Sequence, residues 1–168
     1  MEEKESISNS KSDVGVEFFP TIKGKNLNKK SVTVPGDFLD KNLIVIVAFQ
    51  RWHQNIVDES IEKLEEMKIN HTHHIIEVPM MQQFSKLRRM RLDGIMRAAI
   101  TDNDIRQRTI TVYLDKEEFT TKLSIPNEDT IYWFVVEHVS KSILMRGSGI
   151  PSQKEIQQIS PNRNSRDI

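Results

Sequence analysis

The stretch "LIVIVAFQRWHQNIVDES", residues 43–60, decides the fold. Its first seven residues are continuously apolar and rich in β-branched side chains, which is typical of a central strand covered on both faces of a sheet. After a short polar turn, apolar residues recur at helical spacing: Val57, Ile61, Leu64 and Met67. The sequence therefore predicts a buried strand that leads directly into a helix of about residues 53–68.

The other elements follow from the same kind of pattern. The segment 18–34 predicts a β-hairpin with Asn28 and Lys29 in its turn, and "HHIIEVPM" predicts a short strand that ends at Pro79. A helical stretch is expected at 81–100, and "TITVYLD" predicts another strand. Residues 117–126 fit either a helix or a loop.

The last third of the chain reads as a hairpin and a helix. Two apolar strands flank a turn at residues 138–141, and the glycines Gly147 and Gly149 follow the second strand. The closing helix is expected to start at Ser152, because the Ser152 hydroxyl and the Glu155 carboxylate have the spacing of a capping box.

The bulk composition limits the function classes. The 168 residues contain 24 basic and 24 acidic side chains, so a global electrostatic attraction to nucleic acid or to an acidic membrane is absent. The chain has no cysteine, which excludes disulfides, thiolate metal sites and every thiol mechanism carried by this chain alone. Thiol oxidoreductase and peroxidase activities are therefore excluded.

The N-terminal segment indicates no targeting signal. Residues 1–15 are polar and acidic without an apolar core or an Arg-rich pattern, and the longest apolar run has seven residues. We expect a cytoplasmic protein, peripheral to a membrane at most, with a mitochondrial location only if a transit peptide is missing from this chain. Residues 1–15 are expected to be a disordered lead, 16–160 one domain and 161–168 a flexible tail.

The order of elements resembles that of thioredoxin-like proteins: hairpin, strand, helix, strand, helix, strand, hairpin, helix. The expected fold class is α/β, a thioredoxin-like central mixed β-sheet flanked by helices, with an added N-terminal β-hairpin as in peroxiredoxin-like relatives. "VAFQRWHQNIVDES", "EVPMM" and "MRGSG" together resemble the mitochondrial ATP synthase assembly-factor family. That resemblance implies a chaperone of the membrane-embedded proton-channel subunit and covers about residues 18–159.

The turn Trp52, His53, Gln54 and Asn55 is the candidate site. Against the thioredoxin pattern Trp-Cys-x-x-Cys, His53 stands where the attacking cysteine would be and Ile56 where the resolving one would be. A helix N-terminus disfavours positive charge, so we expect the pKa of His53 to fall if it moves at all. Redox relatives have a cis-proline just before the strand that faces this turn. Pro126 is the one candidate here, but it lies several residues ahead of "IYWFVV", and the residue next to that strand is Thr130. We interpret the turn as a vestigial groove without catalytic residues, in which Trp52 either forms an apolar rim or packs on its own helix.

Two further clusters have alternative interpretations. On a strand, His71 and His73 of "HTHH" would share a face and could hold zinc, although no third ligand is identifiable. A surface loop end is the favoured interpretation, and we expect no metal site.

Residues 84–99 would form a helix with a basic docking face of Lys86, Arg88, Arg89 and Arg91. Its alternatives are a solvated helix face or a site for an anionic membrane; nucleic acid is less favoured because aromatic residues do not interleave with the basic ones.

The leading hypothesis is a non-redox binding module with a protein client, an assembly or chaperone-like factor that needs no cofactor. The alternatives are a membrane-surface or nucleic-acid binder that acts through the basic helix, and a His-based enzyme that uses His53 or a metal-bound His71, His73 or His74.

Overall fold

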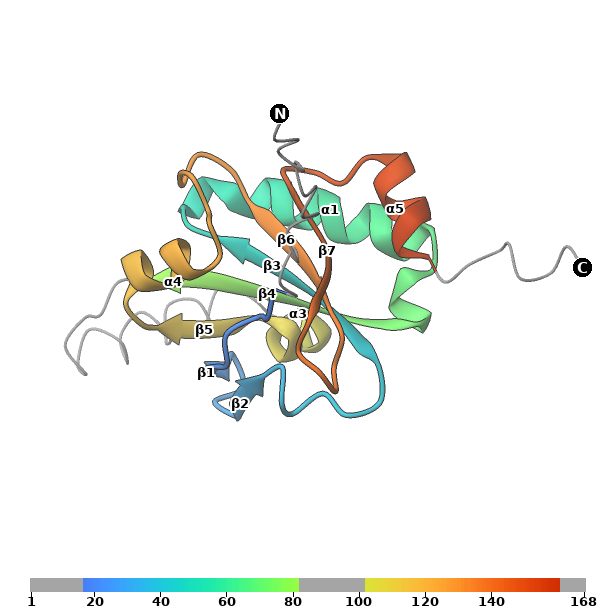
Figure 1. Ribbon diagram of the computed structural model, residues 1–168. Coiled ribbons are helices and arrows are strands. Elements are labelled where there is room, and N and C mark those ends of the chain that lie inside the picture. The colour runs from blue at the N-terminus through green and yellow to red at the C-terminus, as the bar shows by residue number, and fades with distance from the viewer. Residues whose placement is uncertain (1–16, 82–101, 161–168) are drawn as a thin grey trace, which may run out of the picture.

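The computed structural model describes residues 17–81 and 102–160, which form a mixed seven-stranded sheet with helices on both sides (Figure 1). The strands are β1 (Ile22–Asn26), β2 (Ser31–Val34), β3 (Asn42–Ala48), β4 (His73–Met81), β5 (Ile110–Tyr113), β6 (Tyr132–Val136) and β7 (Ile143–Ser148). The helices are α1 (Gln54–Glu66), α3 (Asn103–Arg108), α4 (Lys116–Lys122) and α5 (Gln153–Ile159), with short 3-10 turns η1 (Arg51–His53) and η2 (Ile69–His71).

The strand order is β2-β1-β5-β4-β3-β6-β7. Strands β3, β4 and β5 are parallel to one another, whereas β6 and β7 on one side and β1 and β2 on the other are antiparallel to their neighbours. This arrangement confirms the predicted fold class, a central mixed sheet with an N-terminal hairpin added at one edge.

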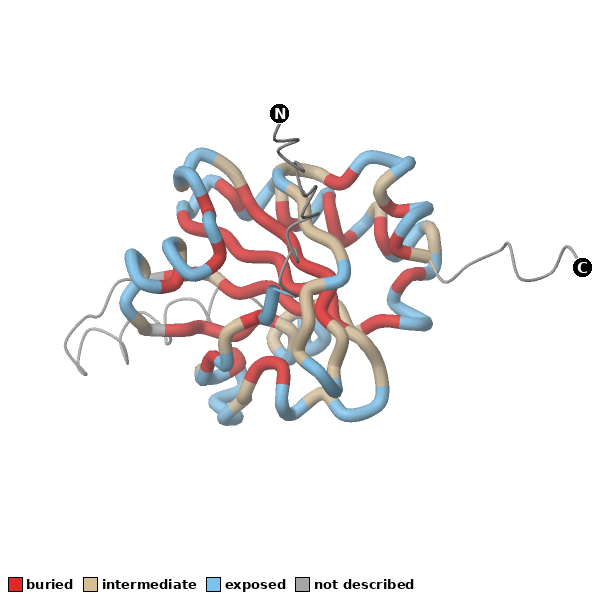
Figure 2. The backbone as a smooth tube through the Cα atoms, viewed as in Figure 1, coloured by how far each residue is buried: buried red, intermediate tan, exposed pale blue. Residues whose placement is uncertain are grey.

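Strand β3 lies in the middle of the sheet and is buried on both faces, as its sequence predicts. Leu43, Val45 and Val47 pack into one core with Phe19 and Phe134, among others. The alternate residues Ile44 and Ile46 pack into the second core, under α1 and α5. Figure 2 shows the buried chain concentrated in these central strands, and Figure 1 shows α1 and α5 over the same face. A continuous apolar run is needed here because both side-chain directions lead into a core.

Strand β4 runs past the proline that was predicted to end it. Pro79 is paired with Ala48 of β3, and β4 continues to Met81. On its other side, β4 pairs with β5 at Glu77↔Thr109 and again from Met80↔Val112, and the ladder is interrupted between these pairs. Pro79 lies in the interruption, where the missing N–H breaks no ladder hydrogen bond. The prediction that the strand ends at Pro79 was therefore wrong.

The remaining local predictions have clear outcomes. In the segment 117–126, which fits either a helix or a loop, residues 117–122 belong to α4, whose N-cap Asp115 accepts a hydrogen bond from the Glu118 amide. Helix α5 begins as predicted: the Ser152 hydroxyl accepts from the Glu155 amide at 3.1 Å and the Glu155 carboxylate accepts from the Ser152 amide at 3.0 Å. The first hairpin turns with Lys29 at a φ of 65°.

The two edges of the sheet are formed by β2 and β7. At one edge, β2 has four residues and is followed by Pro35. At the other, Glu17 and Phe19 pair through their backbones with Ile143 and Lys141 at the start of β7. Residues 17–19 are thereby fixed against the sheet.

Several sequence predictions lie outside the described residues: the lead 1–15, the tail 161–168, and the helix 84–99 with its basic docking face Lys86, Arg88, Arg89 and Arg91. These remain predictions. Within 17–81 and 102–160, none of the helices combines the length and the apolar character needed to cross a bilayer.

Candidate functional site

The candidate site lies where the central strand β3 ends and the chain turns into α1. Phe49 and Gln50 leave the sheet, η1 makes a single tight turn, and α1 begins at Gln54. The strand-to-helix passage predicted from the sequence is therefore confirmed, with the helix one residue later than expected. Val57 and Ile61 of α1 are buried against the sheet, and this packing holds the start of the helix in place.

His53 is a fully buried side chain that holds the turn together. Its Nδ1 accepts hydrogen bonds from the Phe49 amide at 3.0 Å and from the Gln50 amide at 3.2 Å. An atom that accepts two N–H groups carries no hydrogen, so the ring is in the tautomer with its proton on Nε2. The imidazole thus replaces hydrogen bonds that the backbone loses as it leaves the sheet.

This geometry keeps His53 neutral. Burial lowers the pKa of His53, and the smaller opposing influence of Asp129 and Glu128 does not compensate for it. Protonation would also place a hydrogen on Nδ1, facing two amide N–H groups. The predicted fall in pKa is confirmed in direction, with burial as its main cause. Because its lone pair is already engaged, His53 is poorly suited to act as a general base.

Trp52 is the exposed member of the turn. Its side chain is 58% exposed, and its ring meets the His53 imidazole edge-on at 4.2 Å between centroids. Gln54 and Asn55 are also exposed, and the Gln54 amide donates to the Asp58 carboxylate at 2.9 Å. Of the two interpretations of Trp52, the apolar rim fits better, because a ring packed on its own helix would be covered.

The loop before β6 lies beside this turn, close enough for Asp129 and Glu128 to act on the pKa of His53. Asn127 Oδ1 accepts from the Tyr132 hydroxyl at 2.9 Å and from the Asp129 amide at 3.1 Å, which fixes the loop. Among the loop hydrogen bonds of the described chain, the backbone of Thr130 takes part in none. The cis peptide bond of the described residues is Val34–Pro35, so Pro126 is not the cis-proline of redox relatives.

The three histidines of "HTHH" do not converge. His71 is exposed in η2, as the favoured loop-end interpretation expects, and does not share a strand face with His73. His73 is buried and bonded to the Thr72 hydroxyl at 2.8 Å, which departs from the expected surface position. His74 points to the opposite face of β4 and bonds to Asp40 at 2.7 Å. In the part of the chain that is described, no three His, Asp or Glu side chains are grouped closely enough to hold a metal ion.

One buried carboxyl was not singled out from the sequence. Glu77 of β4 is buried under α1, and its Oε1 accepts from the Thr109 hydroxyl at 2.6 Å. Its Oε2 has no hydrogen-bond partner among residues 17–81 and 102–160. Burial raises the pKa of Glu77, while Thr109 and Arg108 act in the opposite direction. The alternation of β4, with Ile75 facing the same core, was the one sequence signal that could have placed Glu77 inside.

Comparison with known proteins identifies the fold. No family model and no curated protein matches the chain. Solved structures do match the chain. One is a thiol:disulfide interchange protein from Bacteroides sp., with a TM-score of 0.56 and 13% sequence identity; the match covers 90% of this chain and 94% of that one. A second is BsSco, a member of the Sco family of cytochrome c oxidase assembly proteins (TM-score 0.57, 12% identity, 86% and 91%). A third is Mycobacterium tuberculosis AhpC (TM-score 0.54, 12% identity, 91% and 94%). The chain therefore has a thioredoxin-like fold, shared with redox proteins, in a sequence that contains no cysteine.

Proposed function

We propose that this chain is a non-redox binding module whose Trp52 turn (residues 52–55) receives an extended segment of a protein client. One observation carries the proposal: His53, which the Trp-Cys-x-x-Cys pattern sets against the attacking cysteine, is buried, neutral and bonded to the backbone, beside an exposed tryptophan. Such a turn is rigid and apolar at its rim, and it has no nucleophile. It is suited to contact a chain and not to react with it.

The contacts that a client would make follow from this geometry. Tryptophan is among the side chains that contribute most to protein interfaces, because it buries a large rigid surface and still has a polar N–H. The Thr130 backbone, which lies in the loop beside the turn, offers N–H and C=O groups for strand-like pairing with an extended segment. A client would thus lie between the Trp52 ring and the loop 127–131.

More specifically, the binding module would have an assembly or chaperone-like role. BsSco shares the fold and belongs to a family of cytochrome c oxidase assembly proteins. The sequence resemblance to the ATP synthase assembly-factor family points to the same kind of client, a subunit of a membrane complex such as the proton-channel subunit. In both cases the module would hold a client segment and would not change its covalent structure.

A permanently unfolded protein tests the binding step. Reduced and carboxymethylated α-lactalbumin, labelled with a fluorophore, is titrated with the purified chain and binding is followed by anisotropy. We expect saturable binding that Trp52→Ala weakens by about 10-fold, the loss typical of an interface hot spot. Leu39→Ala is the matched control, because Leu39 is 79% exposed and distant in sequence from the turn. Equal affinity of the Trp52 variant and the wild type would show that the turn is not the binding site.

A second assay tests the absence of redox chemistry. The purified chain is expected to reduce insulin disulfides no faster than buffer containing the same reductant. Turnover above that background, in a preparation free of other thioredoxin-like proteins, would contradict a purely binding role.

A further inference from the structure

The sheet has a gap on the side of the molecule that holds the β1–β2 turn. Strand β4 begins at His73, but β5, its neighbour, begins only at Ile110, and the first pairing between the two is Glu77↔Thr109. Among the described residues, no strand pairs with His74–Ile76 on this side of β4. The chain before β5 instead forms α3, which is tied to the hairpin by the hydrogen bond from the Leu27 amide to the Arg106 carbonyl at 3.0 Å.

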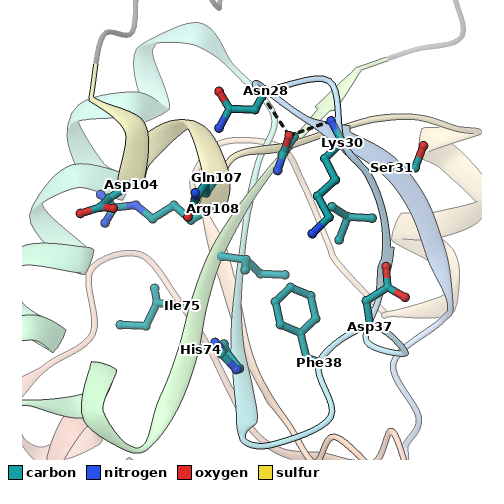
Figure 3. Close-up of a pocket in the computed structure, with 13 residues that line it drawn as sticks. Asn28, Lys30, Ser31, Asp37, Phe38, His74, Ile75, Asp104, Gln107 and Arg108 are labelled. Atoms are coloured by element: carbon teal, nitrogen blue, oxygen red, sulfur yellow. Dashed lines mark hydrogen bonds between the residues drawn. The ribbon is translucent and has the colours of Figure 1, made fainter.

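A cavity of about 460 Å³ occupies this gap (Figure 3). It lies between the β1–β2 hairpin, the start of β4, α3 and the loop after β2. Its volume falls within the range of about 300–1,000 Å³ that is usual for small-molecule sites. The backbone groups on this edge of β4 at His74–Ile76 are available to a ligand in the gap, because no strand within residues 17–81 and 102–160 pairs with them.

One wall of the cavity is apolar. Phe38 faces the cavity, and its ring lies 5.2 Å from the His74 ring between centroids, with 55° between the ring planes. Val32 and Ile76 pack in the same core as Phe38, whereas Ile75 lines the cavity from the other face of β4. His74 is held in place by its bond to Asp40, so the inclined rings form a fixed apolar corner in which a planar group can pack on Phe38.

The cation that faces this wall is Lys30. Its side chain runs into the cavity toward Phe38 (Figure 3), and it forms no ion pair with any described residue. Arg108 also lines the cavity, but its guanidinium is paired with Glu65 at 3.2 Å. Lys30 is therefore the charge that a ligand would neutralise.

The acidic residues of the cavity limit the charge of that ligand. Asp37 and Asp104 both line it, and the Asp37 carboxylate accepts a hydrogen bond from the Thr33 amide at 2.8 Å. Two carboxylates would repel a polyphosphate more strongly than a single negative charge, and a single negative charge is enough to pair with Lys30. We propose that the cavity binds a small organic monoanion with a flat apolar portion, such as an aromatic carboxylate. The ring lies against Phe38 and the carboxylate bonds to the Lys30 ammonium.

Benzoate and benzamide test this proposal because they have the same shape and differ in charge. Each is titrated into the ¹⁵N-labelled full chain and followed by amide chemical shifts. For benzoate we expect shifts concentrated at residues 30–32, 37–38 and 74–76, with a Kd of about 1 mM, as is reasonable for nine non-hydrogen atoms. Benzamide is expected to bind at least 5-fold more weakly, because its neutral amide cannot form an ion pair with the ammonium.

Substitutions of Lys30 and of its neighbour Lys29 test whether the Lys30 charge determines the affinity for benzoate. Lys30→Gln is expected to weaken benzoate binding about 5-fold or more and to leave benzamide binding unchanged. Lys29→Gln is the matched control, since Lys29 is the neighbouring exposed lysine of the same turn and does not line the cavity. Shifts scattered over the surface, equal binding of benzamide, or equal effects of the two lysine variants would each overturn the proposal. The outcome is independent of whether the Trp52 turn binds a client.

Discussion

Replacement of His53 tests directly whether its imidazole holds the turn together. In His53→Ala, the buried Phe49 amide loses its acceptor, which costs about 1–3 kcal/mol, and the partly buried Gln50 amide loses a bond worth about 0.5–1.5 kcal/mol. The space left by the ring adds to this loss, because the site is fully buried. We expect a total decrease of about 3 kcal/mol in the free energy of unfolding, a large part of the ~5–15 kcal/mol of a typical domain.

Two further substitutions distinguish the hydrogen bonds from the volume. Asparagine at position 53 can place its Oδ1 where the Nδ1 of His53 lies, whereas glutamine places its oxygen one bond farther out. We therefore expect His53→Asn to recover about half of the loss and His53→Gln to recover little. Urea unfolding followed by circular dichroism measures the differences. In a thermal scan, a loss of ~3 kcal/mol corresponds to a decrease of about 6–12 °C in Tm for a chain of this length.

The pH dependence supplies a second readout from the same variants. The pKa of His53 is lowered in the folded state, so the unfolded chain takes up the proton first as the pH falls. Its contribution to stability is complete above the unfolded value of about 6.5 and is lost as the pH falls from there through the folded-state pKa. His73, whose pKa burial also lowers, contributes in the same direction. His53→Asn should therefore show a shallower loss of stability below pH 6.5. An Asn variant no more stable than the Ala variant would refute the proposed role of Nδ1.

Two other substitutions test the packing of the sheet. Burial raises the pKa of Glu77, so its contribution to the free energy of unfolding is present below the unfolded-state pKa and is lost as the pH rises through the folded-state pKa. In thermal scans, Glu77→Gln should therefore gain stability over the wild type progressively as the pH rises. A difference that stays constant with pH would contradict this. A Cβ on Gly147 would overlap the Trp133 ring, so Gly147→Ala should cost about 1–3 kcal/mol or more in urea unfolding. Gly36→Ala, whose Cβ would make an ordinary contact at 3.6 Å, is the control, and equal losses in both variants would argue against this close packing.

Most of the fold could be predicted because its signals are local. The apolar run of β3 faces two cores, the hairpins have turn residues at the right spacing, and the capping box at Ser152 involves residues three positions apart. Pro79 was misread because its tolerance depends on a break in pairing with β5, thirty residues away. The sequence pattern of a single strand does not show on which edge its pairing with a neighbouring strand is interrupted.

The strand-to-helix turn was predicted in position, but the hydrogen bonds that His53 makes in it were not. The sequence placed Trp52 and His53 at the strand-to-helix turn and predicted that the pKa of His53 would fall. The double acceptor role of Nδ1 depends on where the amides of Phe49 and Gln50 point, which the sequence does not specify. The cavity beside Lys30 could not be predicted at all, since it arises from the unequal lengths of β4 and β5.

The border formed by β2 has a consequence for self-association. An open border strand is a template on which a second molecule can add its own strand, and long flat borders promote aggregation. Here β2 has four residues, and Pro35 removes a donor directly after it. Two copies that meet at this border would therefore find few groups with which to continue the ladder. A concentrated solution of this protein should resist fibre formation at the β2 border.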